Sequence, residues 1–183
     1  MRRSVPRIPP VSDADMTEEQ QQLLAPLVKQ GWVDNVFRTI IQHPKLYKRW
    51  IVFANHVLFK STLPAREREI AILRVGWLCQ AEYEWAQHVE IGKRAGITDP
   101  EINKIVEGPD GDWDAKDRAL LTAVDELHQN KDISDATWEK LTDHFSQKQI
   151  VDLVFAVGQY TLVSMALNTF GVQLDERLSG FPK

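Results

Sequence analysis

The chain of 183 residues has a single cysteine, Cys79, and lacks several features that would place it in a class at once. One cysteine cannot form an intramolecular disulfide, so a packed core must stabilise the fold. The 22 basic and 26 acidic residues give a net charge of −4 and contain no long block of one sign, which disfavours nucleic acid as a partner. No apolar signal region follows the arginines at the start, so we expect a cytoplasmic protein.

Long apolar runs are scarce as well. The exception is residues 150–172, which approach the ~20 residues needed to cross a bilayer. This run contains Asp152, Gln159 and Asn168, so we expect a buried or subunit-interface helix and no membrane contact. Its apolar surface exceeds what one small bundle needs, which favours a homo-oligomer.

Helical periodicity is the dominant pattern in the chain, and no segment shows the sustained alternation of a half-buried strand. The sequence therefore predicts an all-α bundle of about seven to eight helices in one domain, 1–183. Apolar spacing, capping residues and glycine stops predict helices over residues 17–31, 44–61, 63–80, 81–96, 98–108, 114–131, 134–145 and from 146.

The segments between these helices carry their own signals. The proline-rich start predicts an extended arm over about residues 1–14, and residues 32–44 lack a clear period and predict a loop. A turn cluster at 108–113 separates two halves that share a weak sequence echo. Two related halves and a chance likeness of two buried helices explain that echo equally well.

The stretch CQAEYEWAQHV, residues 79–89, holds the main candidates for chemistry. Glu84 and His88 are four residues apart, so on a helix the carboxylate can reach the imidazole. Glu69 on the preceding helix can approach the same face if the chain reverses between Cys79 and Ala81. A histidine beside a buried glutamate can relay protons near neutral pH. The alternative is a solvated pair that stabilises the helix by only ~0.3–0.5 kcal/mol.

Other residues are candidates for lining a substrate pocket beside this pair. The aromatic pair Tyr83 and Trp85 could contact a ring, although large aromatics on such a helix usually belong to the core. Cys79 could be a nucleophile with a lowered pKa at a helix start, or an inert buried thiol. The dispersed histidines lack ligand spacing, so we expect no metal site. Ala81 shares the helix face of His88, whereas His56 could instead be a core residue and Arg74 could instead form salt bridges. The full set of pocket candidates is Tyr83, Trp85, Cys79, Ala81, His56 and Arg74.

Residues 63–102, LPAREREIAILRVGWLCQAEYEWAQHVEIGKRAGITDPEI, resemble the carboxymuconolactone decarboxylase family, which includes the alkyl hydroperoxidase D proteins. The EYEWAQHV core followed by AGIT is the specific part, and a looser likeness extends through 123–127 and 170–176. The resemblance implies an all-α fold of the alkyl hydroperoxidase D type. It also implies a homo-oligomer, as a dimer, trimer or hexamer.

The hydroperoxidase branch of this family has a glutamate followed by the pattern C-x-x-C-x-x-x-H. On this chain the glutamate falls on Glu69, the two cysteines on Ala81 and Glu84, and the histidine on His88. Both cysteines are therefore missing. Because peroxide reduction in that branch needs an attacking and a resolving thiol, we expect no dithiol activity.

The decarboxylase branch instead has the pattern E-x-x-x-H in this segment, and Glu84 and His88 match that pattern. The resemblance implies proton transfer while a small lactone bearing a carboxylate loses carbon dioxide. It also implies a role in the breakdown of aromatic compounds and a reaction that needs no cofactor. We expect His88 to carry the proton, Glu84 to orient it and Glu69 to relay protons or shape the pocket. Two alternatives stay open: a thiol-dependent antioxidant peroxidase that uses Cys79, and a non-catalytic binding member of the fold.

Overall fold

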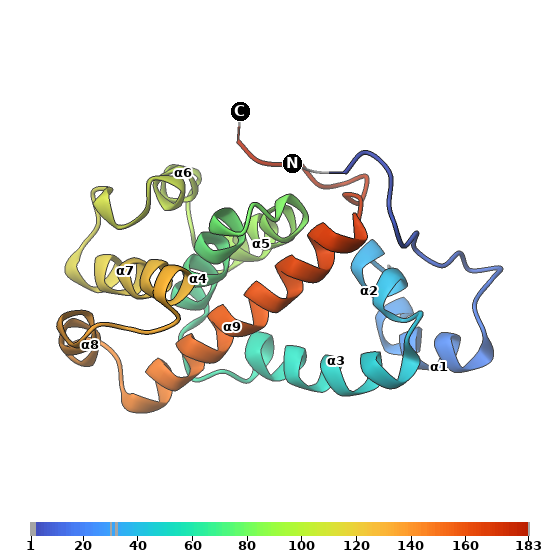
Figure 1. Ribbon diagram of the computed structural model, residues 1–183, viewed down its shortest axis with the longest axis horizontal. Helices are drawn as coiled ribbons and strands as arrows, with labels where there is room; N and C mark the ends of the chain where they lie inside the picture. The colour runs from blue at the N-terminus through green and yellow to red at the C-terminus, as the bar shows by residue number, and fades with distance from the viewer. Residues whose placement is uncertain (1–2, 30, 32, 183) are drawn as a thin grey trace.

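The computed structural model describes residues 3–29, 31 and 33–182, and regular structure in these ranges is entirely helical. The prediction of an all-α fold is therefore confirmed (Figure 1). Residues 1–2 of the expected arm and residue 32 of the expected loop lie outside the described ranges. The helices are α1 (Glu18–Val28), α2 (Asn35–Ile40), α3 (Pro44–Phe59), α4 (Ala65–Leu78), α5 (Glu82–Arg94), α6 (Asp99–Glu107), the 3₁₀ turn η1 (Gly108–Asp110), α7 (Ala115–Asn130), α8 (Asp135–Thr142) and α9 (Gln147–Phe170).

Local capping chemistry explains why most helix starts agree with the sequence pattern. Thr17, Thr98 and Ser146 each accept a hydrogen bond from the third helical amide, and a Gln or Glu at that third position bonds back to the cap. Such capping boxes satisfy two amides that the helix itself leaves unpaired. At the other end of α9, Gly171 adopts φ 71°, a left-handed conformation that glycine reaches without steric penalty.

Helix α2 is the element that the sequence pattern did not predict. It has six residues, Asn35–Ile40, which is too short to display a helical period. Its first amide, that of Asn35, donates to the Asp175 carboxylate at 3.0 Å, across 140 positions of sequence. A tertiary contact therefore caps this helix, whereas the side chain of the N-cap residue Asp34 makes no capping hydrogen bond.

Helix α4 is the central element of the bundle. Nine of its 14 residues are buried, and it packs against α5, α7 and α9. Three of the buried residues, Glu67, Glu69 and Arg74, are ionisable. Since a buried charge is tolerated only when it is paired, each of these side chains must have a partner on a neighbouring helix.

Helix α9 runs diagonally across one face of the molecule and ends beside α2 (Figure 1). The arm holds this end, because the amides of Arg7 and Ile8 donate to the Phe170 carbonyl at 2.7 and 3.2 Å. By length and composition α9 is long and apolar enough to span a membrane, but half of its most apolar window is buried in the fold.

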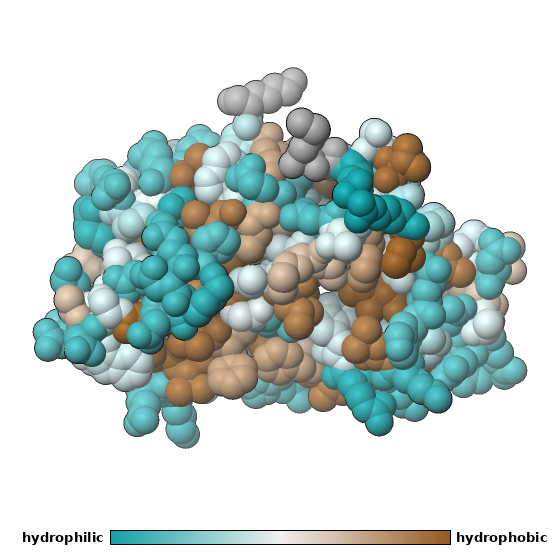
Figure 2. Space-filling view, viewed as in Figure 1, coloured by the Kyte–Doolittle hydropathy of each residue, from teal (hydrophilic) through white to brown (hydrophobic). Residues whose placement is uncertain are grey.

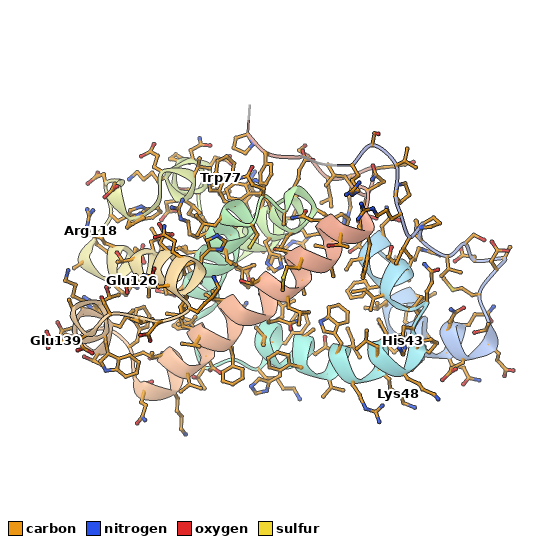
Figure 3. All side chains as sticks on the ribbon, viewed as in Figure 1. His43, Lys48, Trp77, Arg118, Glu126 and Glu139 are labelled. Carbon is orange, nitrogen blue, oxygen red and sulfur yellow. The ribbon has the colours of Figure 1, made fainter. Side chains whose placement is uncertain are left out.

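The C-terminal segment returns across the beginning of α5. Its Phe181 ring packs edge-on against Trp77, with ring centroids 5.0 Å apart, and lies 5.8 Å from Trp85. Figure 3 labels Trp77 at this end of the molecule. The turn between α4 and α5 is thus covered by residues from the far end of the chain.

Candidate active site

A tight reversal joins α4 to α5 and brings their side chains face to face. Cys79 ends α4, Gln80 takes a left-handed φ of 51°, and Ala81 precedes α5 and donates its amide hydrogen to the Gly76 carbonyl at 2.9 Å. A Cβ on Gly76 would lie 3.6 Å from the backbone nitrogen of Trp85, so α5 packs closely on the end of α4. The reversal places Glu69 opposite His88.

The imidazole of His88 lies between two carboxylates. Its Nδ1 is 2.6 Å from Glu69 Oε2, and its Nε2 is 2.9 Å from Glu84 Oε1. The exposed fractions are 0% for Glu69 and 4% for both Glu84 and His88. The three residues that the sequence singled out are thus in contact inside the fold, and the solvated-pair alternative does not describe them.

The charges around His88 decide its protonation state. Burial alone would lower the pKa of His88, but the two carboxylates more than offset burial and raise the pKa to about 10. At neutral pH the ring is therefore an imidazolium that donates from both nitrogens. Arg68 Nε lies 3.1 Å from Glu69 Oε1, so two cations balance two anions in the cluster. This balance lets four ionic groups stay largely out of water.

Tyr160 of α9 completes the surroundings of His88, and nothing in the sequence linked the two. The rings meet edge to face, with centroids 4.7 Å apart and planes at 81°. Burial, with the nearby Glu84 and Glu69 carboxylates, raises the pKa of Tyr160 well above its ordinary value, so the phenol stays neutral. The only sequence signal for Tyr160 was its position on an apolar helix, which indicates burial and not a partner.

Two of the expected pocket residues lie elsewhere, which corrects the prediction for them. Arg74 donates from Nε and Nη2 to the two Asp125 oxygens at 2.7 Å, and from Nη1 to the Ile105 and Val106 carbonyls at 2.9 Å. It therefore joins α4 to α6 and α7. His56 is exposed on α3 and lines a separate shallow hollow of about 350 Å³ at the start of α9.

The aromatic candidates have structural partners. The Tyr83 hydroxyl donates to Asp175 Oδ2 at 2.6 Å and accepts from the Val36 amide at 3.2 Å, which ties α5 to α2 and the C-terminal segment. Trp85 is 1% exposed and packs against Trp77 in the core, as the core alternative expected.

A cavity of about 260 Å³ lies at the start of α5. Tyr83 is on its wall, whereas Trp85, Glu84 and His88 are not. Among the described residues, its lining is Arg3, Gln80, Glu82, Tyr83, Leu167, Asn168, Gly171, Val172 and Phe181. Ala81 is fully buried and is not part of this lining.

Cys79 does not have the surroundings of an activated thiol. Burial raises the pKa of Cys79, and hydroxyls of Ser164 and Thr161 only partly oppose this effect. Its Sγ lies 3.8 Å from Nδ1 of His128, a neighbour that the sequence did not reveal. The Cys79 side chain belongs to the end of α4 and not to the start of α5, where a helix would stabilise a thiolate. Within the described residues, no group of three His, Cys, Asp or Glu side chains could hold a metal ion.

Comparisons with known proteins bear on the family and the fold of the chain. The model of the carboxymuconolactone decarboxylase family matches residues 44–125, a range that includes Glu69, Glu84 and His88. A search of curated proteins found no significant match.

Solved structures share the fold at low sequence identity. An uncharacterized peroxidase-related protein with an alkylhydroperoxidase AhpD core, from Ralstonia eutropha, aligns with a TM-score of 0.82 and 20% identity over 95% of this chain and 94% of that chain. An uncharacterized peroxidase-related protein from Silicibacter sp. aligns with a TM-score of 0.75 and 18% identity over 96% of this chain and 92% of that chain. A cysteine-to-alanine variant of the debrominase Bmp8, in complex with 2,3,4-tribromopyrrole, gives 0.77 and 12% over 92% and 91%. Residues 44–125 thus match the carboxymuconolactone decarboxylase family model, and the chain has an AhpD-like fold.

Proposed function

We propose that the protein is a carboxymuconolactone decarboxylase-like enzyme that uses acid–base chemistry on a small lactone or carboxylate substrate. The observation that carries the proposal is the imidazole of His88 held at both nitrogens by buried carboxylates, Glu69 at 2.6 Å and Glu84 at 2.9 Å. Such a ring has a fixed orientation and carries a proton at neutral pH, and a positioned general acid needs both.

The chemistry follows from electron and proton balance. When a carboxylate leaves as carbon dioxide, the electrons of the broken C–C bond pass into a conjugated carbonyl and form a dienolate. His88 then gives its proton to the dienolate carbon, and Glu69 holds the ring in place. Loss of that proton leaves the cluster of Arg68, Glu69, Glu84 and His88 with one net negative charge. This charge draws a proton back from solvent and repels an anionic product.

We place the substrate in the cavity at the start of α5. Glu82 and Tyr83 line it, and Glu84 follows them in the same helical turn. His88 itself is buried and does not line this cavity. Because proton transfer requires hydrogen-bond reach, a rearrangement near the start of α5 has to bring the substrate and the imidazole together.

The test is a screen of lactones and aromatic acids with mass-spectrometric detection of products. Turnover should fall at least ~100-fold in His88→Ala and in Glu84→Gln, with the helical circular dichroism retained. The matched control is His56→Ala, which removes an exposed histidine from α3 and should keep full turnover. Undiminished turnover in both site variants would overturn the proposed mechanism.

A second candidate function rests on Cys79 and His128, whose Sγ and Nδ1 are 3.8 Å apart. In this reaction the thiol attacks a hydroperoxide, giving a sulfenic acid and an alcohol, and its proton passes through His128 to the departing oxygen. Two molecules of an external thiol then reduce the sulfenic acid to the thiol, with release of water and a disulfide. Peroxide consumption that is lost in Cys79→Ser but kept in His88→Ala would favour this function over the first.

A further inference from the structure

The cavity of about 260 Å³ at the start of α5 has one cationic side chain on its described wall, that of Arg3. Arg3 belongs to the N-terminal arm and is exposed. In the described part of the chain, no carboxylate forms an ion pair with its guanidinium. A guanidinium presents its N–H donors in a planar fork that matches the two oxygens of a carboxylate. The wall of the cavity therefore offers a partner for an anion.

Contacts with the end of α9 fix the place of Arg3. Its carbonyl accepts a hydrogen bond from Gln173 Nε2 at 2.9 Å. Further along the arm, the amides of Arg7 and Ile8 donate to the last carbonyl of α9. A Cβ built on Gly171 would lie 3.3 Å from both Cβ and Cδ of Arg3, so the stem of the arginine packs closely on this glycine. In Figure 2, strongly hydrophilic side chains lie where the arm passes the end of α9.

The same wall also has a carboxylate, that of Glu82. Its Oε1 lies against the C-terminal segment, because a Cβ built on Gly180 would collide with it. Since Arg3 pairs with none of the described carboxylates, the two opposite charges are apart on the wall. A bound anion is attracted at one place and repelled at the other. It therefore has one preferred orientation, with its negative group at Arg3.

The rest of the wall sets the size and polarity of the ligand. Three apolar side chains and two side-chain amides belong to it: Leu167, Val172, Phe181, Gln80 and Asn168. Both amides donate to carbonyls at the end of α4, which fixes their positions. Because an apolar cavity of ~150 Å³ is large enough for benzene, 260 Å³ accepts one ring with a short polar group.

We propose that this cavity binds a single-ring carboxylate, and that Arg3 determines the preference by pairing with the carboxylate. The proposal rests on the proposed function in taking this cavity as the place of the substrate. The carboxylate at Arg3 is one that the reaction retains, because an ion pair opposes departure as neutral carbon dioxide. The arm lies outside residues 44–125, which match the family model, so this part of the site is a feature of the chain itself.

Titration with benzoate, followed by ¹⁵N NMR of the Gln80 and Asn168 side-chain amides, tests the pairing. Millimolar benzoate should shift these signals, and Arg3→Gln should weaken binding by about tenfold or more, because a charged hydrogen-bonded contact is lost. Arg3→Lys should give an intermediate affinity, since it keeps the charge and loses the fork. The matched control is Arg7→Gln, at an exposed arginine of the same arm that does not line the cavity, and it should bind benzoate like the wild type.

Benzamide has nearly the shape of benzoate without its charge. It should bind more weakly than benzoate, and equally to the wild type and to Arg3→Gln. Signals that do not shift with millimolar benzoate, or equal affinity for benzoate in wild type and Arg3→Gln, would overturn the proposal. Lower thermal stability of Arg3→Gln with unchanged benzoate binding would overturn it too, since the arginine would then serve only the negative end of α9.

Turnover separates failure of this proposal from failure of the proposed enzyme. With a substrate found by the screen, Arg3→Gln should raise KM about tenfold and keep kcat, because the contact is the same in the ground and transition states. Turnover that needs His88 but not Arg3 would leave the enzyme and remove the role of Arg3. Benzoate binding that needs Arg3, without turnover of any screened compound, would support the binding site and count against the enzyme.

Discussion

Helix α4 carries two buried ionic centres that differ in one respect. Around Arg74, a permanently charged group meets one carboxylate and two carbonyls, and every contact is fixed. Around His88, a titratable ring meets two carboxylates, Glu69 and Glu84. The first centre can only hold helices together, whereas the second can also exchange a proton. Burial and pairing are common to both centres, and the ability of His88 to titrate separates the catalytic candidate from the structural one.

The largest expected effect is on stability at the structural centre. Arg74→Met leaves the Asp125 carboxylate and the Ile105 carbonyl without their donor, and should lower the free energy of unfolding by about 3–5 kcal/mol. Urea unfolding followed by circular dichroism measures this change. Turnover per folded molecule should stay within about twofold of wild type, and a specific loss of turnover would mean that the two centres are not separate.

The next effect is a dependence of stability on pH that, of the two centres, only the one at His88 produces. The pKa of His88 is about 10 in the folded chain, above the ~6.5 of an unfolded histidine. The folded state therefore holds an extra proton, and its stabilisation is complete below pH 6.5 and declines as pH rises through 10. Urea unfolding between pH 6 and 10 should show a decline of a few kcal/mol. Arg74→Met should retain this slope, whereas a flat wild-type profile would refute the linkage.

The two carboxylates at His88 should contribute unequally. Among the effects that raise the pKa of His88, the charge of Glu69 is the largest, followed by its hydrogen bond and then by the contacts of Glu84. Glu69→Gln and Glu84→Gln should therefore both lower the pKa of His88, and Glu69→Gln should lower it more. The upper limb of the pH–rate profile of each variant reports the change. Equal shifts, or a larger one in Glu84→Gln, would mean that Glu69 is not the main cause of the raised pKa of His88.

The smallest effect concerns Tyr160, whose ring edge meets His88 at 4.7 Å. Tyr160→Phe keeps the aromatic contact and should change stability by less than about 1 kcal/mol, whereas Tyr160→Leu loses an aromatic pair worth ~0.5–1.5 kcal/mol beyond its area. Thermal unfolding of the two variants separates these outcomes. If Tyr160→Phe is the more damaging substitution, the hydroxyl and not the ring acts on His88.

The parts of the fold that the sequence predicted are those that local chemistry determines. Thr98 and Ser146 begin helices through their own side chains, and Glu84 and His88 meet because they are four residues apart on one helix. The sequence predicted the contact between Glu69 and His88 only on the condition that the chain reverses between α4 and α5. Gln80, with its left-handed φ, makes this reversal.

What the sequence did not predict depends on contacts between distant residues. Helix α2 is capped by Asp175, Tyr160 reaches His88 from α9, and His128 lies beside Cys79 from α7. Arg74 was misplaced for the same reason, because its partner Asp125 lies 51 positions away. Periodicity tells which face of a helix is buried, but not which residue it meets there.

The proposed chemistry requires that His88 is an imidazolium at neutral pH, held by Glu69 and Glu84. The most direct measurement is an NMR titration of the His88 ring in ¹⁵N-histidine-labelled protein, assigned with His88→Ala. We predict that both ring nitrogens stay protonated through pH 8 and that the ring titrates near 10. A ring that titrates at or below the ordinary histidine value of about 6.5 would contradict the account.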